Sequence, residues 1–156
     1  MILRAFAIVS LLAVPAHAQN APRVQHLSRP GSRAPFSPAV RAGNTVYLSG
    51  QIGALPDGTI PQGMDAQARA AMTNLRDAAA LAGVGFDDMV KCTVMLADMS
   101  QWAAFNAVYV TYFKPGRLPA RSAFGVDGLA LGAGVEIECI AVAPSGADHP
   151  ADASPP

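Results

Sequence analysis

A segment near the carboxyl end of the chain alternates between apolar and charged side chains, and this alternation restricts the fold more than any other feature. Ile137, Cys139 and Ala141 fall on one side, and Glu136, Glu138 and Ile140 fall on the other. Successive side chains of a strand point to opposite faces of a sheet, so the pattern predicts a strand with one buried face and one open face. The buried face needs helices to cover it, and a half-apolar open face is typical of a surface that meets another subunit.

The rest of the sequence provides the other strands of such a sheet and the helices that would cover it. Strands are predicted at 39–42, 45–52, 89–96, 121–126 and 134–143. Apolar residues recur at helical spacing from 64 to 81, and an aromatic stripe from Trp102 to Phe113 predicts a second helix whose rings pack in the core. The order hairpin, helix, strand, helix, strand, strand predicts an α+β domain with two helices on one face of a mixed sheet.

The charged residues limit the class of partner. The chain of 156 residues has 11 basic and 11 acidic residues, so its formal net charge is zero. A protein that binds nucleic acid through phosphates needs a basic face, which this composition does not favour. The 3 histidines and 2 cysteines show no spacing typical of a metal site. We therefore expect neither nucleic acid nor a metal ion as the main ligand.

The amino-terminal segment 1–18 has the three parts of a secretory signal peptide. Arg4 gives a positive start, residues 5–14 form an apolar stretch, and Ala16-His17-Ala18 is a cleavage signal of the A-x-A type. The apolar stretch is too short for a membrane span, which needs about twenty residues. We expect cleavage after Ala18, a periplasmic or secreted protein, and no membrane attachment after cleavage.

The remaining chain divides into three parts by composition. Residues 19–30 are polar, contain prolines and lack periodicity, which predicts a linker. Residues 144–156 are rich in Pro, Ala, Ser and Asp, which predicts a disordered tail. The folded domain is therefore expected to span residues 31–143.

Arg121 and Glu136 are the residues whose chemistry best fits a catalytic role. Arg121 is the first residue of a predicted strand. A guanidinium can hold a carboxylate through two parallel hydrogen bonds. Glu136 belongs to the open face of the last strand, where a carboxylate can orient or deprotonate a water molecule. Together they predict a pocket for a small carboxylic acid that reacts with water. Taken alone, each residue is also compatible with a solvated surface, and Glu138 is interpreted as structural.

Several short segments, in this order, resemble the RidA group, the YjgF-type reactive intermediate deaminases. The matching segments are Ala34-Pro35-Phe36-Ser37, Ala42-Gly43-Asn44, Ser49-Gly50-Gln51-Ile52, Asn74-Leu75, Val90-Lys91-Cys92-Thr93-Val94, Phe105-Asn106-Ala107-Val108-Tyr109, Pro119-Ala120-Arg121-Ser122 and Val135-Glu136-Ile137-Glu138. Because they occur in order at compatible spacing through most of residues 34–141, the resemblance is more specific than any one segment.

The resemblance implies a chorismate-mutase-like fold and a homotrimer in which the open sheet faces form a central barrel. It also implies active sites in the clefts between neighbouring subunits. Proteins of this group hydrolyse small 2-imino acids, or their enamine tautomers, to 2-keto acids and ammonia without a cofactor. The expected ligand of this chain is therefore a small 2-imino or 2-keto acid.

The resemblance also assigns roles to particular residues. Arg121 matches the arginine that holds the substrate carboxylate, and Glu136 matches the glutamate beside the attacking water. Gly50 matches the glycine whose backbone contacts the substrate, and Ser49 lines the same place.

Two positions depart from the family pattern. Phe36 replaces the usual tyrosine, and Ala123 replaces the usual cysteine, so each change removes a polar group from the expected pocket. Phe36 is interpreted as a pocket wall. The alternative function is therefore a trimer that binds small carboxylates at the subunit cleft without catalysis. A protective, chaperone-like role and the ribonuclease activity described for some members are further alternatives, the last disfavoured by the zero net charge.

The two cysteines of the chain allow two interpretations. The resembled fold places the strands of Cys92 and Cys139 side by side, and an exported protein meets oxidants, so a disulfide is predicted. Two buried free thiols are the alternative, because buried cysteine also behaves as a small apolar residue.

Overall fold

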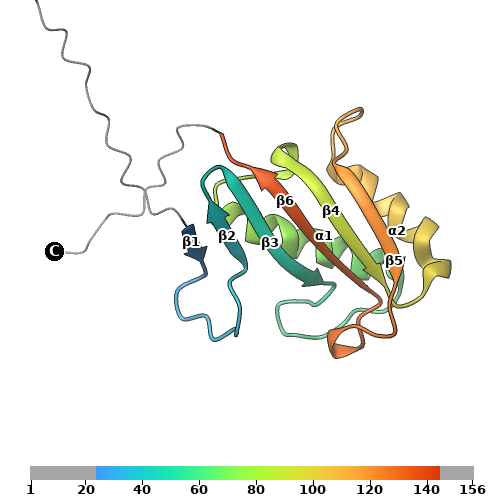
Figure 1. Cartoon of the computed structure of the whole chain (residues 1–156). Helices are drawn as coiled ribbons and strands as arrows, with labels where there is room; N and C mark the ends of the chain where they lie inside the picture. Colours follow the sequence, from blue (N-terminus) through green and yellow to red (C-terminus); the bar gives the residue numbers. More distant parts are fainter. Residues whose placement is uncertain (1–23, 145–156) are drawn as a thin grey trace, which may run out of the picture.

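The computed structural model describes residues 24–144, whose framework is one six-stranded mixed sheet (Figure 1). The strands are β1 Val24–Leu27, β2 Ala39–Ala42, β3 Thr45–Ile52, β4 Met89–Leu96, β5 Ala120–Gly125 and β6 Val135–Val142. Their spatial order is β1-β2-β3-β6-β4-β5, and β4–β5 is the parallel pair in an otherwise antiparallel sheet. The segment 1–18, and the tail beyond residue 144, lie outside the described residues.

Helices α1 (Met64–Leu81) and α2 (Trp102–Tyr109) both cover the same face of the sheet, as Figure 1 shows. The predicted α+β class with two helices on one face is confirmed. The second helix is shorter than the aromatic stripe, because 3-10 turns at Met99–Gln101 and Val110–Tyr112 flank it. Within residues 24–144, neither helix combines the length and apolar character that crossing a membrane requires.

Strand β1 lies inside the segment 19–30 that was predicted as a linker, so the ordered sheet begins earlier than expected. It pairs antiparallel with β2, from Val24 opposite Ala42 to Leu27 opposite Ala39. A strand of four residues carries too little alternation to be recognised from sequence. Its partner is also distant along the chain, so the pairing that stabilises it is not a local property.

The core lies between α1, α2 and the covered sheet face. Buried alanines of α1, including Ala68, Ala71 and Ala79, let the helix approach the sheet closely. The approach is so close that a Cβ on Gly53, just after β3, would lie 2.4 Å from the backbone oxygen of Gln67 in α1. Only glycine fits there without moving backbone atoms, so Gly53 fixes the end of β3 against the helix.

Cys92 of β4 and Cys139 of β6 lie directly opposite each other and form a disulfide in the structure. Both face the helices and are 0% and 3% exposed. The structure therefore agrees with the predicted disulfide and not with two free thiols.

The open face, the sheet face away from the helices, carries polar and apolar side chains together. Glu136 and Glu138 lie there, since the residues between them are buried under the helices. Tyr47 and Phe124 share this face and are 50% and 47% exposed. Half-exposed large apolar side chains on an open sheet face are typical of a surface that another subunit covers.

Candidate active site

Arg121 lies on β5, the edge strand that α2 covers. Its register partner on β4 is Cys92, so its side chain points to the helix side of the sheet. The guanidinium carbon lies 4.8 Å from the centre of the Trp102 ring and 4.5 Å from that of Tyr109. Both distances fall within the range of cation–π attraction. Two aromatic side chains of α2 therefore hold the cation in one position.

Three buried polar atoms at α2 and β5 have no hydrogen-bond partner within the described residues. They are Arg121 Nη1, the Tyr109 hydroxyl oxygen and Asn106 Oδ1. Burial raises the pKa of the Tyr109 hydroxyl, and the positive charge of Arg121 opposes this with a smaller lowering. Because buried polar groups nearly always have a partner, these atoms mark a place suited to a polar ligand.

Glu136 lies on the open face, where its carboxylate occupies space that is available because Gly50 has no side chain. It lies opposite Met95 of β4 and Ile52 of β3. A Cβ built on Gly50 would lie 1.9 Å from Glu136 Oε1, so the carboxylate rests in the space that any other residue would fill. Burial raises the pKa of the Glu136 carboxyl, and the charge of Glu138 raises it further. A carboxylate with a raised pKa is a better base toward water.

The register of β3 shifts between Leu48 and Gln51, next to Gly50. Ser49 joins this irregular stretch to the loop before β2, because its hydroxyl donates to the Ser37 backbone oxygen at 2.8 Å. Phe36 belongs to the same loop and is 56% exposed. Within one described chain Phe36 is thus a surface residue.

The structure does not bring all the predicted site residues together within one chain. Arg121 and Ala123 lie on the helix side of the sheet, because they pair with Cys92 and Val94 of β4. Glu136 lies on the other side, so Arg121 and Glu136 do not share a pocket within one described chain. A site that uses both needs a second subunit.

Sequence reasoning missed a part of the Arg121 environment. The aromatic stripe was interpreted as core packing, which is correct for Phe105 and Tyr109 as buried residues. Trp102, Asn106 and Tyr109, however, are spaced to share one side of α2, and the two rings contact Arg121. A polar Asn between aromatic residues at helical spacing was the available signal. Within residues 24–144 no group of three or more His, Cys, Asp or Glu side chains could hold a metal ion.

Comparison with known proteins gives consistent similarities. A family model described as Endoribonuclease L-PSP matches residues 26–143. The 2-iminobutanoate/2-iminopropanoate deaminase of Mus musculus is 44% identical over 115 residues, which are 72% of this chain and 84% of that protein. The crystal structure of yeast Mmf1 has a TM-score of 0.71 and 38% identity, covering 78% of this chain and 99% of that one. RidA from the Antarctic bacterium Psychrobacter has a TM-score of 0.70 and 37% identity, with coverages of 76% and 98%.

Proposed function

Because this chain belongs to the Endoribonuclease L-PSP family, which includes the RidA (YjgF) proteins, we propose that it hydrolyses small 2-imino acids to 2-keto acids and ammonia. The observation that carries this proposal is the state of Arg121. Its guanidinium contacts two aromatic rings, and its buried Nη1 has no partner within the described residues. Such a group is ready to bind a carboxylate without first giving up another partner.

The reaction follows from the chemistry of these groups. Arg121 holds the substrate carboxylate and so fixes C2 of the imine. Glu136 accepts a proton from water while the water oxygen attacks C2 and the C–N π electrons move to nitrogen. Protonation of that nitrogen gives a neutral amino alcohol, and loss of ammonia with formation of the C–O double bond gives the 2-keto acid. The raised pKa of Glu136 favours its role as the base in the first step.

The activity is tested by generating a 2-imino acid in place with an amino-acid oxidase. Loss of imine is followed by trapping with semicarbazide, and ammonia is measured separately. We expect the wild-type protein to remove imine faster than buffer alone. No rate above buffer would reject the proposal.

A second candidate function is binding of small carboxylates without catalysis. Phe36 and Ala123 favour it, because both positions lack the polar group expected from the family. A keto acid that binds to a protein without hydrolytic activity would make this function the better one.

The opposite placement of Arg121 and Glu136 supports the proposal of a homotrimer. We propose that Arg121 of one subunit meets Gly50 and Glu136 of its neighbour. β5 is an edge strand, so a neighbouring subunit can approach it. The half-exposed apolar residues of the open face support a further subunit contact.

Mixing two inactive variants tests this arrangement. Arg121→Ala and Glu136→Gln proteins are dissociated, mixed and reassembled, and random mixing then restores about one interface in four. We expect activity to return only in the mixture. No recovery in verified mixed oligomers would show that both residues act within one subunit, and light scattering that gives a monomer would reject the trimer.

The disulfide supports one further proposal, that the protein acts in the periplasm or outside the cell. Disulfides persist in oxidising compartments and are rare in the cytosol. The signal-peptide pattern of residues 1–18 supports the same location. Cell fractionation tests it, and recovery of full-length protein in the cytosolic fraction would contradict it.

A further inference from the structure

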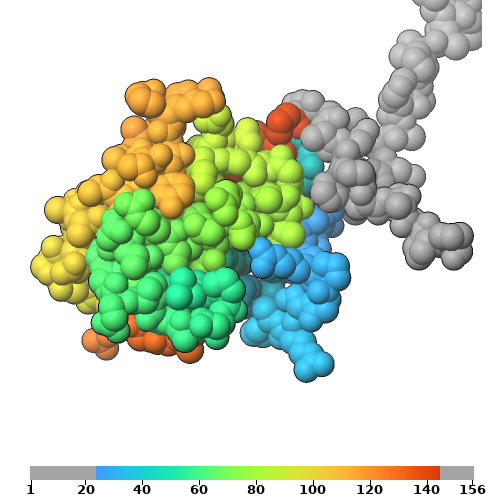
Figure 2. Space-filling view, turned by 180° about the vertical axis from the view of Figure 1, so that it is seen from behind, coloured from blue at the N-terminus to red at the C-terminus, as the bar shows by residue number. Residues whose placement is uncertain are grey.

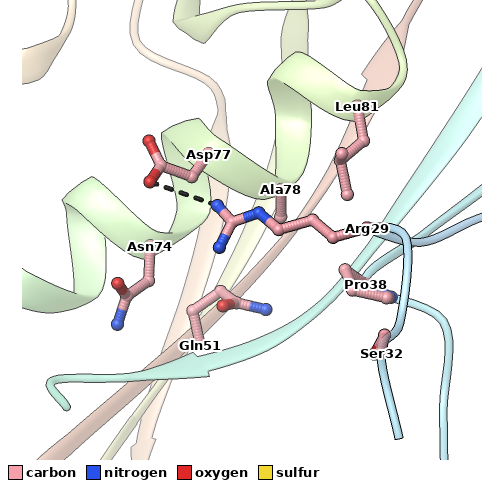
Figure 3. A pocket seen from close by; sticks show the side chains of 8 residues that line it. All are labelled: Arg29, Ser32, Pro38, Gln51, Asn74, Asp77, Ala78 and Leu81. Atoms are coloured by element: carbon pink, nitrogen blue, oxygen red, sulfur yellow. Dashed lines mark hydrogen bonds and ion pairs between the residues drawn. The ribbon is translucent and has the colours of Figure 1, made fainter. Parts of the chain in front are cut away.

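A polar hollow lies far from Arg121, at the other edge of the sheet. It has a volume of about 190 Å³ and lies between α1, β3 and the loop after β1 (Figure 3). Figure 2 shows the helical face of the molecule, where the blue segment that begins at Val24 lies beside the green α1. Arg121 is on β5, whereas β1 forms the opposite edge of the sheet. Gln51, which lines the hollow, pairs with the buried Ile137, so the hollow lies on the helix side of the sheet, whereas Glu136 lies on the open face. The hollow is therefore separate from Arg121 of its own chain and on the other side of the sheet from Glu136.

An ion pair lines the hollow. Arg29 Nη2 donates to Asp77 Oδ2 at 3.3 Å, and Figure 3 shows the Arg29 side chain extending toward the helix. The two side chains are 66% and 41% exposed, so water weakens their attraction and a ligand can replace it. Arg76 donates to the other oxygen of Asp77, so two cations share one carboxylate. The Arg29 charge is thus only partly compensated.

Two amides in the hollow have acceptor oxygens to offer. Both Nδ2 hydrogens of Asn74 are used, by the backbone oxygens of Ile52 at 3.0 Å and Ala54 at 2.9 Å. Gln51 Nε2 donates to the Ser49 backbone oxygen at 2.9 Å. Within residues 24–144 no hydrogen bond is made to either amide oxygen. With Asp77, the hollow has three acceptor groups, as many as an ammonium group has donors.

We propose that this hollow binds a small α-amino acid as a zwitterion. The ligand carboxylate would bind Arg29, and its ammonium group would bind Asp77 with the amide oxygens of Asn74 and Gln51. Arg29 Nη2 and Asp77 Oδ2 are only 3.3 Å apart, so the two charges of the ligand must also be adjacent, as they are in an α-amino acid. The volume equals that of roughly six water molecules, which suits a ligand with a short side chain. This proposal goes beyond the proposed catalytic function and does not depend on it.

The test uses residues 19–156, the protein expected after cleavage of the signal peptide, and carries Arg121→Ala. This substitution prevents carboxylates from binding through Arg121 in the candidate active site. The side-chain amide signals of Asn74 and Gln51 are followed by NMR during titration with L-alanine. Pyruvate and ethylamine are the comparison ligands, since each carries only one of the two charges. We expect saturable shifts of both amides with a dissociation constant on the order of 1 mM. Each comparison ligand should bind at least tenfold more weakly.

Variants then assign the binding to the ion pair. Arg29→Gln and Asp77→Asn should each weaken L-alanine binding at least tenfold, whereas Arg33→Gln, in the same loop but outside the hollow, should not. Absence of saturable shifts would overturn the proposal, as would unchanged binding in both hollow variants. Pyruvate binding as tightly as L-alanine would also overturn it, because the hollow would then be a simple anion site. If a hollow variant does not fold, the titrations of the protein with Arg29 and Asp77 intact, using L-alanine, pyruvate and ethylamine, still test whether the hollow binds a zwitterion.

Discussion

The surroundings of Arg121 and Glu136 differ in how each side chain is held. Arg121 is held by contacts with other side chains, because the Trp102 and Tyr109 rings of α2 contact its guanidinium. The position of Glu136 depends instead on Gly50, because the absence of a side chain at Gly50 leaves space for the Glu136 carboxylate. The first half of the site depends on helix packing and the second on the sheet alone. Substitutions around Arg121 should therefore weaken substrate binding, whereas substitutions around Glu136 should lower the turnover rate.

Removal of the cation should have the largest effect. Arg121→Ala should lower kcat/KM about 1000-fold, on the order of 4 kcal/mol, because the substrate carboxylate loses its partner. Arg121→Lys should recover little, because an ammonium cannot make the two parallel hydrogen bonds. The imine assay measures both. Arg117→Ala, an exposed arginine before β5, is the control, and a similar loss there would contradict a specific role for Arg121.

Filling the space at Gly50 tests the other half. In Gly50→Ala the new Cβ would displace the Glu136 carboxylate, so kcat should fall about 100-fold, which is typical for loss of general base catalysis. The fold should persist, because the clashing atom is the end of a flexible side chain. Melting temperature and keto-acid binding are measured beside kcat. Gly128→Ala, where a Cβ meets nothing within 4 Å, should change none of them. A Gly50→Ala enzyme with normal kcat would show that this carboxylate position is unimportant.

Loss of one ring should weaken the Arg121 half moderately. Trp102→Ala removes one of two cation–π contacts, each of which stabilises by about 1 kcal/mol, so KM should rise several-fold to about tenfold with a smaller change in kcat. Trp102→Phe keeps a ring in place and should recover most of the affinity. If the alanine and phenylalanine variants behave alike, the ring does not position Arg121.

The charge of Glu138 should have the smallest effect, seen only in the pH profile. Glu136 must be ionised to accept a proton, and its pKa is raised by burial first and by Glu138 second. The rate should therefore fall on acidification at a higher pH than for an ordinary glutamate. Glu138→Gln removes the second cause, so the acidic limb should move to lower pH with little change in the maximum rate. Asp127→Asn, an exposed acid elsewhere, should leave the profile in place. Movement to higher pH in Glu138→Gln would contradict this account.

The sequence predicted local features well and non-local ones less well. The alternation around Glu136 was sufficient to place it on the open face, because strand parity is a local property. The face of Arg121 depends on its register with Cys92, which is 29 positions away in sequence and joined to it through α2. The double role of Trp102 and Tyr109 was missed for a similar reason. A ring that packs in the core and a ring that also contacts a cation have the same spacing along a helix.

The disulfide has a topological consequence for the candidate site. Cys92 and Cys139 are 47 positions apart, so the bond closes a covalent ring that contains α2, β5 and most of β6. Closing a ring of this length lowers the entropy of the unfolded chain by an amount equivalent to about 4 kcal/mol. Trp102, Asn106, Tyr109, Arg121 and Glu136 all belong to the ring. A protease that cut one peptide bond in any exposed loop between the two cysteines would therefore leave both halves of the chain joined.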